Sequence, residues 1–407
     1  MQSGLLGGKL GHSYSPQIHA HLGDYPYALY ERTTEEVGEF LQNTPFDGIN
    51  VTIPHKKTVI PFCAELSPVA QKLGAVNTIV RRADGSLLGH NTDYFGFSRM
   101  LQTLSVDIAG KKAVVLGSGG ASNTVVAVLE AAGARIQVIT HRENTPENLA
   151  RHSDAVLLVN ASPEGMYPHN GSSPADLNLF PKLEGVLDLI YNPARTQLLL
   201  DAEARGIPAA NGLEMLVAQA KESAEWFTGQ PIDDDKIDFI LRRLRNQMEN
   251  IILIGMPGSG KTTIGTIVAE KLGKKFVDAD VYLTEKVGRS IPDIFANDGE
   301  AVFRQMETEV LRELGKQSGL VIATGGGCVT REENYPLLHQ NGTLFRIHRP
   351  LDNLSIEGRP LSQTMKLTEM FRFRDPLYRR FADYEVVNDG APEAAAAEIL
   401  RIWEERK

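Results

Sequence analysis

The sequence has only two cysteines among its 407 residues, Cys63 and Cys328, and they lie in different halves without the spacing of metal ligands. This pattern excludes a disulfide framework and predicts idle thiols in a reducing compartment. No apolar run approaches the ~18 residues that a membrane-spanning helix needs, and the first residues do not resemble a signal peptide. We therefore expect a cytoplasmic protein that binds no membrane.

Basic residues are also sparse. The formal net charge is −9, and no run of five basic residues occurs. We expect no nucleic-acid binding, because a nucleic-acid backbone is bound by a basic surface. Small anions must then be held by local basic pockets. With 42% hydrophobic and 23% charged residues, the chain is long enough for two or three globular domains, and it does not indicate an oligomeric state.

A phosphate-binding loop is the clearest motif. An apolar strand over 251–254 runs into Gly255, and Gly260-Lys261-Thr262 follows after four residues, at the start of a helical pattern. The glycines let successive N–H groups point into one concavity, and the helix adds its positive end. Lys261 then reaches the β- and γ-phosphates, and the Thr262 hydroxyl ligates Mg²⁺. The predicted nucleotide site consists of Gly258, Ser259, Gly260, Lys261, Thr262 and Thr263.

The residues before this loop alternate short apolar strands with helical patterns, as in an α/β protein. Polar side chains gather where strands end or helices begin, and such ends converge on one crevice. Hydroxyls, amides, one lysine and one carboxylate suit a polyhydroxylated ligand that bears a carboxylate. Ser15 is also expected to cap a helix that starts with Pro16. The gathered residues are Ser13, Ser15, Asn50, Thr52, Lys56, Asn77 and Asp93.

A second glycine-rich turn, Gly117-Ser118-Gly119-Gly120-Ala121, lies between a predicted strand and a predicted helix. A further strand from residue 135 completes a dinucleotide-binding β-α-β pattern, with Ser122 in the place of a third glycine. His141 and Arg142 stand at the end of that strand, where an NAD site carries an acid. Arginine suits the 2′-phosphate of NADP, whereas the neighbouring Glu143 would repel it. NADP is favoured, and NAD stays open.

Two carboxylates follow the phosphate loop. The run from 276 to 280 is predicted as a strand, on which Asp278 and Asp280 share a face. Asp278 suits the Mg²⁺ shell, and Asp280 suits an acceptor hydroxyl, which it would orient or deprotonate. Arg304 on a predicted helix, Gly326 in a glycine corner, and the basic groups of Arg359 and Arg374 come later in the chain.

Residues 5 to about 247 resemble shikimate dehydrogenase. The similarity rests on His12-Ser13-Tyr-Ser15-Pro16, Asn50-Val-Thr52-Ile-Pro-His-Lys56, Gly74-Ala-Val-Asn77-Thr, Asn91-Thr-Asp93, Gly117-Ser-Gly-Gly-Ala121, Asn160-Ala-Ser-Pro-Glu-Gly-Met166 and Asn211-Gly212-Leu-Glu-Met-Leu-Val-Ala-Gln219. The resemblance implies reduction of 3-dehydroshikimate by NADPH, with Lys56 and Asp93 as the catalytic pair. The implied substrate residues are Ser13, Ser15, Thr52, Asn77, Asp93, Tyr191 and Gln219. The implied cofactor residues are Gly117, Ser118, Gly119, Gly120, Ala121, His141, Arg142, Leu189 and Gly212.

The last ~158 residues resemble shikimate kinase across its whole length. The phosphate loop, Asp278-Ala-Asp280, Phe303-Arg304, Gly325-Gly326-Gly327, Arg359-Pro360-Leu361 and Arg374-Asp-Pro-Leu-Tyr378 carry the similarity. It implies phosphorylation of shikimate at its 3-hydroxyl by ATP and Mg²⁺. Lys261 and Asp280 would be catalytic, Thr262 and Asp278 would hold the metal, and Arg359 would cover the ATP phosphates from a lid. Asp280, Arg304, Gly326 and Arg374 would bind shikimate.

The predicted fold is α/β throughout. We expect an α/β substrate domain over 1–100, completed by helices at about 213–247, a Rossmann-like NADP domain over 101–248, and a P-loop kinase domain with a parallel sheet over 249–407. The interpretation is a bifunctional enzyme that makes shikimate and then phosphorylates it, with small-molecule substrates as its partners. One alternative is an active kinase with a degenerate N-terminal binding module, because the stretch from Arg142 to Asn160 is short. Another is an N-terminal enzyme with a preference for quinate or NAD, on the evidence of Glu143.

Overall fold

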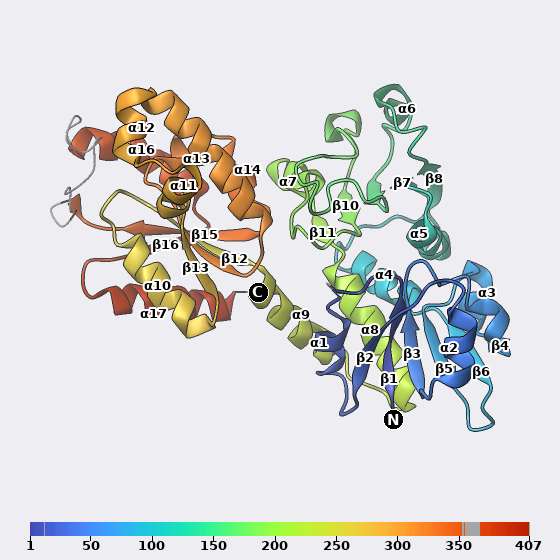
Figure 1. The fold of residues 1–407 in the computed structure, drawn as a ribbon. Helices are drawn as coiled ribbons and strands as arrows, with labels where there is room; N and C mark the ends of the chain where they lie inside the picture. Colours follow the sequence, from blue (N-terminus) through green and yellow to red (C-terminus); the bar gives the residue numbers. More distant parts are fainter. Residues whose placement is uncertain (12, 352–353, 355–366, 407) are drawn as a thin grey trace. The chain divides into compact units, whose positions relative to one another are not determined.

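The computed structural model describes every residue except 12, 352–353, 355–366 and 407. The chain divides into two compact units, and each contains parallel β-strands with helices against them (Figure 1). The predicted α/β class is therefore confirmed. Unit 1 comprises Met1–Gly165, Ser172–Tyr191 and Asp201–Arg243, and unit 2 comprises Met166–Gly171, Asn192–Leu200 and Leu244–Lys407.

The first sheet of unit 1 has six strands in the order β2-β1-β3-β5-β6-β4. Its strands are β1 (Ser3–Gly7), β2 (Tyr27–Glu31), β3 (Gly48–Val51), β4 (Glu65–Leu66), β5 (Thr78–Arg81) and β6 (Leu87–His90). β1 pairs in parallel with β2 and β3, whereas β5 runs antiparallel to β3 and β6. The helices between these strands are α1 (Ser15–His19), α2 (Val37–Asn43) and α3 (Pro68–Leu73). Helix α8 (Leu213–Thr228) packs so closely on β3 that a Cβ at Gly48 would lie 2.1 Å from the Phe227 ring.

The second sheet of unit 1 is parallel, with the order β11-β10-β9-β7-β8. Its strands are β7 (Lys112–Leu116), β8 (Arg135–Ile139), β9 (Leu157–Asn160), β10 (Gly185–Asp188) and β11 (Ala209–Asn211). Helices α5 (Gly120–Ala131), α6 (Pro146–Ala150) and α7 (Gln197–Ala204) follow strands of this sheet. Phe97 and Met100 of α4 (Asp93–Gln102) are buried in the same core as Val115 and Leu187, so α4 joins the two sheets.

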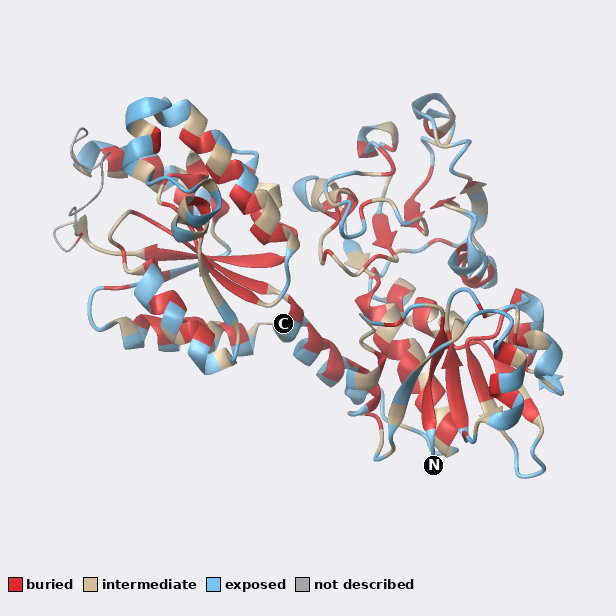
Figure 2. Cartoon of the chain, viewed as in Figure 1, coloured by how far each residue is buried: buried red, intermediate tan, exposed pale blue. Residues whose placement is uncertain are grey.

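Unit 2 is built on one parallel sheet of five strands in the order β13-β14-β12-β15-β16. Its strands are β12 (Asn250–Ile254), β13 (Lys275–Asp278), β14 (Leu320–Ala323), β15 (Gly342–His348) and β16 (Tyr384–Val387). Its helices are α10 (Lys261–Leu272), α11 (Ala279–Val287), α12 (Ile291–Asn297), α13 (Gly299–Lys316), α14 (Asn334–His339), α16 (Leu367–Phe381) and α17 (Pro392–Glu405). The central strands are buried on both faces, as Figure 2 shows. Helix α9 (Asp235–Met248) leads into this unit along the chain.

Two short segments from earlier in the chain, 166–171 and 192–200, also belong to unit 2. The Ala194 N–H donates to Asn341 Oδ1 at 2.8 Å, and the Arg195 N–H donates to the Gln340 carbonyl at 2.8 Å. Asn170 Nδ2 donates to Gln340 Oε1 at 2.7 Å. Gln340 and Asn341, which follow α14, therefore have some of their hydrogen-bond partners in residues more than a hundred positions away.

Two expectations about local structure are wrong. Asp280 does not lie on a strand, because β13 ends at Asp278 and α11 begins at Ala279. The Asp278 carboxylate accepts the N–H groups of Asp280 and Val281, and this N-cap starts the helix. Ser15 is not a cap either: α1 begins at Ser15, its N-cap is Tyr14, and no side chain caps it.

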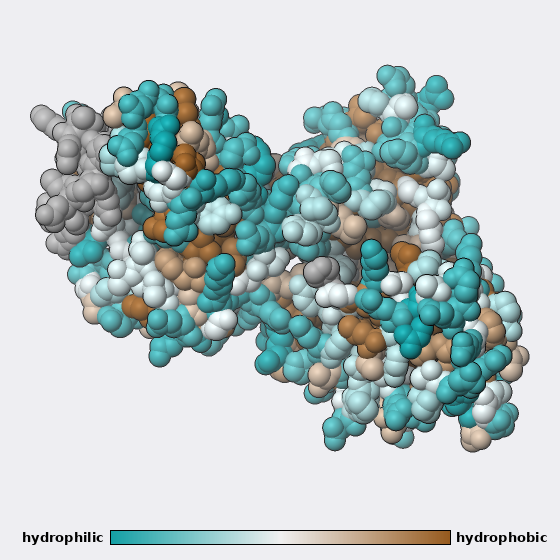
Figure 3. Space-filling view, in the orientation of Figure 1, coloured by the Kyte–Doolittle hydropathy of each residue, from teal (hydrophilic) through white to brown (hydrophobic). Residues whose placement is uncertain are grey.

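Hydrophilic residues cover most of the surface visible in Figure 3, and brown apolar residues form small patches among them. Among the residues that the structure describes, no helix is long and apolar enough to cross a membrane.

Candidate active sites

A cavity of about 490 Å³ opens in unit 1. All the side chains predicted to hold the first substrate line it, together with three of the predicted cofactor residues. The lining includes Ser13, Ser15, Thr52, Lys56, Asn77, Asp93, Tyr191 and Gln219, with Ala121, Leu189 and Gly212 from the cofactor side. Strand ends of the first sheet, the start of α5 and the start of α8 thus meet at one place. The sequence pattern had predicted this convergence.

The Lys56–Asp93 pair lies on the wall of this cavity. Lys56 Nζ is 2.6 Å from Asp93 Oδ2, and the two side chains are 28% and 13% exposed. Asn77 Nδ2 donates to the other carboxylate oxygen at 3.0 Å. Asp93 is the first residue of α4, where the positive end of the helix favours a carboxylate. The ammonium is therefore held in one orientation, within reach of a ligand in the cavity.

Tyr191 supplies a phenol to the same cavity. Burial raises the pKa of Tyr191, so its hydroxyl stays protonated and can donate a hydrogen bond. Its ring stands edge-on to Tyr14, with the centroids 6.1 Å apart. Gln219 lies opposite on α8, where its Nε2 donates to the Leu216 carbonyl at 2.8 Å. Both side chains are thus fixed by neighbours before a ligand binds.

The second glycine-rich turn has the geometry of a dinucleotide-binding loop. Gly117 has φ +108°, and a Cβ there would lie 2.9 Å from the Ala161 carbonyl oxygen, so only glycine fits. Added Cβ atoms at Gly119 and Gly120 would meet nothing within 4 Å, which leaves this side open to a ligand at the start of α5. Ser122 Oγ donates to the Gly117 carbonyl at 2.8 Å. The serine thus ties the turn to the helix.

His141 and Arg142 are exposed at the end of β8 and do not line the cavity. Glu143, which we expected to repel a phosphate, follows β8, and its side chain turns back toward the end of that strand. Its Oε2 accepts the Thr140 hydroxyl at 2.7 Å and the Thr140 N–H at 3.1 Å. These bonds, the hydroxyl first, lower the pKa of Glu143. The Glu143 carboxylate is therefore hydrogen-bonded to Thr140.

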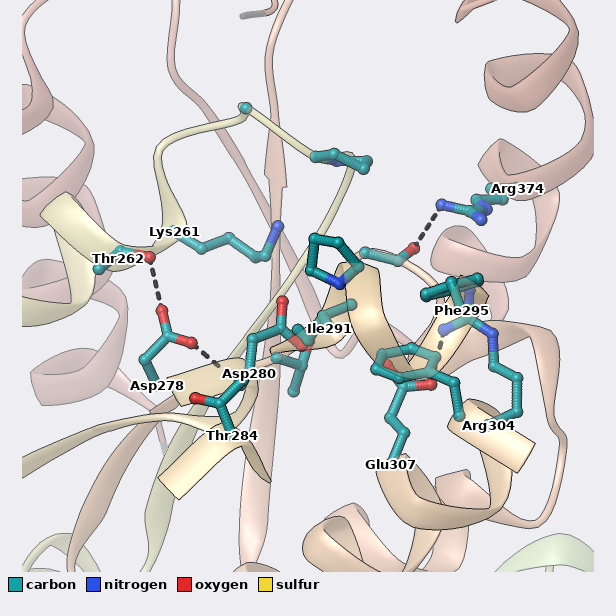
Figure 4. Close-up of a pocket in the computed structure, with 18 of the residues that line it drawn as sticks. Lys261, Thr262, Asp278, Asp280, Thr284, Ile291, Phe295, Arg304, Glu307 and Arg374 are labelled. Atoms are coloured by element: carbon teal, nitrogen blue, oxygen red, sulfur yellow. Dashed lines mark hydrogen bonds and ion pairs between the residues drawn. The ribbon is translucent and has the colours of Figure 1, made fainter. Parts of the chain in front are cut away.

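A cavity of about 680 Å³ in unit 2 gathers the second set of predicted residues (Figure 4). It is lined by Gly258, Gly260, Lys261, Thr262, Thr263, Asp278, Asp280, Arg304, Gly326 and Arg374. Ser259, also part of the loop, is buried, and its carbonyl accepts a hydrogen bond from Asn388 Nδ2 at 2.7 Å. Arg359, predicted to cover the phosphates from a lid, lies outside the described residues.

The phosphate loop is shaped as the sequence indicated. Gly255, Gly258 and Gly260 have φ values of +147°, +82° and +96°, and α10 begins directly after them at Lys261. Lys261 Nζ donates to the carbonyls of Gly255 and Met256 at 2.9 and 3.0 Å. Figure 4 shows this ammonium pointing into the cavity. The loop thus presents backbone N–H groups, a helix N-terminus and a cation to one concavity.

The opposite side of this cavity carries the acceptor residues (Figure 4). Arg304 pairs with Glu307 at 2.7 Å and with Glu300 at 3.2 Å. Burial raises the pKa of Glu307, and Arg304 offsets this only in part. Arg374 donates to the Gly326 carbonyl at 3.2 Å. Two guanidinium groups and the Asp280 carboxylate therefore surround a space that suits a hydroxylated carboxylate ligand.

The glycine corner after β14 is required by these contacts. A Cβ at Gly327 would lie 2.1 Å from Arg304 Nη1, and one at Gly325 would lie 2.5 Å from Glu307 Oε1 and 2.7 Å from Asp280 Oδ1. Real Cβ contacts are never this short, so any larger residue would displace the charged side chains.

Comparison with known proteins identifies both parts. Residues 5–79 match the model of the shikimate dehydrogenase substrate-binding domain, and residues 257–404 match the shikimate kinase model. Shikimate dehydrogenase (NADP(+)) of Caldanaerobacter subterraneus subsp. tengcongensis is 34% identical over 274 residues, which cover 60% of this chain and 96% of that protein. The chain belongs to the shikimate dehydrogenase family. It joins a shikimate kinase domain to it, so the chain is a fused, bifunctional enzyme of the shikimate pathway, as predicted.

Solved structures of shikimate dehydrogenases are also similar to a large part of this chain. A chorismate mutase/shikimate 5-dehydrogenase fusion protein of Clostridium acetobutylicum is 38% identical with a TM-score of 0.55, over 60% of this chain and 96% of that chain. Shikimate 5-dehydrogenase of Thermus thermophilus, solved with NADP(H) and shikimate, is 31% identical with a TM-score of 0.54, over 60% of this chain and 99% of that chain. The first of these proteins is itself described as a fusion that includes a shikimate dehydrogenase.

A buried hydroxyl network behind the dehydrogenase cavity was not predicted from the sequence. Its centre is Ser223 on α8, which has no exposed surface. Ser223 Oγ lies 2.8 Å from Asn50 Nδ2, 2.8 Å from Thr78 Oγ1 and 3.0 Å from Thr92 Oγ1, and it donates to the Gln219 carbonyl at 2.9 Å. Thr92 precedes Asp93, and both hydrogen-bond to the Asn77 side chain. The network therefore links α8 to the residues that hold the Asp93 carboxylate.

In the kinase unit, no role was predicted for Glu307, which holds Arg304, or for Arg349, which lines the cavity. Only Arg349 could have been found from the sequence. It directly follows a strand, and site residues of α/β proteins gather at the ends of strands.

Proposed function

We propose that the dehydrogenase unit reduces 3-dehydroshikimate to shikimate with NADPH, and that the kinase unit phosphorylates the 3-hydroxyl of shikimate with ATP and Mg²⁺. The Lys56–Asp93 pair carries the first proposal, because it stands in a cavity lined by both substrate and cofactor residues. The second rests on one cavity that combines the phosphate loop with Asp280, Arg304 and Arg374. Both proposals agree with the similarity of the chain to shikimate dehydrogenases and to the shikimate kinase family model.

Lys56 acts as the proton donor in the reduction. NADPH supplies a hydride, which leaves negative charge on the carbonyl oxygen of the substrate. The Lys56 ammonium stabilises this charge and transfers a proton to the oxygen. Asp93, held by Asn77, keeps the ammonium in place and accepts a substrate hydroxyl. Ser13, Ser15, Thr52, Tyr191 and Gln219 bind the remaining hydroxyls and the carboxylate.

NADP fits this site better than NAD. Gly117, Gly119 and Gly120 leave room for the pyrophosphate at the start of α5. Arg142 and His141 are exposed at the end of β8, where a 2′-phosphate would lie, and Glu143 is bonded to Thr140. Glu143 stays ionised in this arrangement, so the proposal of NADP rests on Arg142 and His141 and on the similarity to NADP(+) enzymes.

In the kinase unit, Asp280 orients the 3-hydroxyl and accepts its proton, while Arg304 and Arg374 grip the carboxylate. Lys261 and the loop N–H groups stabilise charge on the transferred phosphoryl group. Thr262 Oγ1 and Asp278 Oδ2, 2.8 Å apart, would hold Mg²⁺, which needs few protein ligands when phosphates and waters complete its shell. A bound Mg²⁺ would neutralise negative charge on the nucleotide phosphates.

We further propose that the enzyme works in the cytoplasm on small molecules, in keeping with its two free thiols.

The experiment uses the full chain and two reciprocal variants. NADPH oxidation is followed with 3-dehydroshikimate, then repeated with NADH, and phosphorylation is followed with ATP, Mg²⁺ and shikimate. Lys56→Ala should abolish reduction and leave phosphorylation unchanged, and Asp280→Asn should do the reverse. The activity that each variant keeps shows that its unsubstituted unit is intact, and circular dichroism of both variants checks the fold of the substituted unit. If the unsubstituted chain reduces 3-dehydroshikimate with neither nicotinamide, the dehydrogenase proposal fails; if it reduces only with NADH, the cofactor proposal fails.

A further inference from the structure

The kinase cavity contains a cation for which neither the sequence motifs nor the proposed mechanism has a use. Arg349 directly follows β15 and lines the cavity together with Lys261 and Arg374. Its Nε is buried and has no hydrogen-bond partner among the residues that the structure describes. Within the described ranges Arg349 forms no ion pair with a carboxylate. A buried guanidinium N–H without a partner is costly, and an incoming anion would remove that cost.

Strand pairing places this residue beside the phosphate loop. β15 pairs with β12 in a register that sets Ile254 opposite Arg346, so the loop from Gly255 starts next to the end of β15. A Cβ at Gly255 would lie 2.5 Å from the Ile347 carbonyl oxygen. Asn388 bridges the same region, because its N–H donates to the His348 carbonyl at 2.7 Å and its Nδ2 donates to the Ser259 carbonyl at 2.7 Å. Arg349 is the next residue along the strand.

The order of the strands separates Arg349 from the acceptor side. Asp280 follows β13, and Gly326 follows β14, on one side of β12. Arg349 follows β15 on the other side. The phosphate loop leaves the sheet from β12, between these two groups. Because the end of β15 also adjoins the phosphate loop, we expect a ligand group at Arg349 to belong to the molecule bound by that loop.

The other cations of the cavity are already engaged. Arg304 is paired with two carboxylates, Arg374 donates to the Gly326 carbonyl, and Lys261 donates to two loop carbonyls. The cavity wall also carries the carboxylates of Asp278, Asp280 and Glu307, which repel a polyphosphate. A further positive group near the loop offsets this repulsion, and the planar guanidinium fork matches phosphate oxygens.

We propose that Arg349 binds a phosphate group of the nucleotide in the kinase unit. The inference rests on the proposed kinase function and adds a nucleotide-binding residue to it. Replacing Arg349 should weaken nucleotide binding and leave shikimate binding and the dehydrogenase reaction unchanged.

The test uses the full chain with Arg349→Gln and Arg349→Lys. We expect Arg349→Gln to raise the KM for ATP and the dissociation constant of MgADP about ten- to hundredfold, with the KM for shikimate unchanged. Arg349→Lys should weaken nucleotide binding less, because lysine keeps the positive charge but lacks the planar guanidinium group. Arg331→Gln is the matched control, since Arg331 pairs with Glu333 and does not line the kinase cavity. The KM for shikimate reports folding of the kinase unit, and NADPH-dependent reduction by the same samples reports folding of the dehydrogenase unit.

Two further probes identify the part of the nucleotide that is bound. Magnesium tripolyphosphate and adenosine are compared as competitors of ATP. Arg349→Gln should weaken inhibition by tripolyphosphate by a similar factor and leave inhibition by adenosine unchanged. A loss confined to adenosine or to shikimate, or parameters equal to those of Arg331→Gln, would overturn the proposal. A chain that neither binds MgADP nor phosphorylates shikimate before any substitution would instead refute the proposed kinase function.

Discussion

At the scale of single residues, the buried Ser223 hydroxyl is connected by hydrogen bonds to the side chain that holds Asp93. It joins Asn50, Thr78 and Thr92, and the latter two also contact the Asn77 side chain that holds Asp93. We expect Ser223→Ala to lower kcat/KM for 3-dehydroshikimate about tenfold, because Thr92 and Asn77 lose a fixed partner.

The matched control for this prediction is Ser98→Ala, which removes a hydroxyl that only returns to the Tyr94 carbonyl of its own helix. Phosphorylation of shikimate by both variants should equal that of the unsubstituted chain. Equal kcat/KM values for Ser223→Ala and Ser98→Ala would contradict a positioning role.

The two thiols lead to a prediction about reactivity and pH. Burial raises the pKa of Cys63 to about 11 and that of Cys328 to about 12, so neither forms much thiolate near neutral pH. In the unfolded chain both return toward about 8.5, and raising the pH from about 7 to about 9 then generates thiolate. Alkylation by iodoacetamide should therefore accelerate with pH in urea and stay slow in the native protein over that range. Mass spectrometry of the two cysteine peptides measures this, and fast native labelling of Cys328 would contradict the burial.

Residues in short motifs could be predicted, and residues that act through tertiary contact could not. Lys56, Asp93 and the phosphate loop occur in patterns whose chemistry depends on neighbours in the chain. Ser223 and Glu307 sit in ordinary helical sequence, and their partners become neighbours only when α8 or α13 packs against a sheet. The bond of Glu143 to Thr140 could not be predicted for the same reason, since it depends on how the chain turns after β8.

At the scale of elements, the close approach of α13 and α14 depends on one glycine. A Cβ at Gly315 would lie 1.9 Å from the Leu337 carbonyl oxygen. Relative to glycine, alanine stabilises an isolated helix by about 1 kcal/mol. A clash with the backbone in a packed interior, however, destabilises the protein by about 1–3 kcal/mol or more. Gly315→Ala should therefore lower the temperature of kinase inactivation by several degrees.

Gly390→Ala is the control for this substitution, because an added Cβ there meets nothing within 4 Å. Its inactivation temperature should be that of the unsubstituted chain. A Gly315→Ala variant as stable as Gly390→Ala would show that α14 can move without cost.

Element types were largely predictable, whereas their ends were not. Alternating strands and helices follow from hydrophobic periodicity, and the phosphate loop fixes the strand before it and the helix after it. The boundary between β13 and α11 was missed because Asp278 accepts two N–H groups and starts a helix where alternation suggested a longer strand. Local hydrogen bonding by a side chain decided that boundary.

At the scale of the whole molecule, the limits of the kinase unit do not follow chain order. A fragment of residues 249–407 would lack segments 166–171 and 192–200, which supply donors to Gln340 and Asn341. We expect the fragment to bind MgADP as the full chain does, and to unfold several degrees lower, because buried groups of this corner become exposed. Calorimetry of both proteins checks this, and equal unfolding temperatures would show that the two segments contribute nothing. The domain boundaries inferred from the sequence stay predictions.

The presence of two separately lined cavities on one chain has a consequence for metabolic balance. Each cavity draws its described lining from its own unit, so the polypeptide supplies the two sites in a one-to-one ratio. Gene expression then cannot adjust one step against the other. The steady level of the shared intermediate depends on the relative kcat/KM of the two sites, and selection for flux acts on side chains such as Ser223 and Arg349 instead of on promoters.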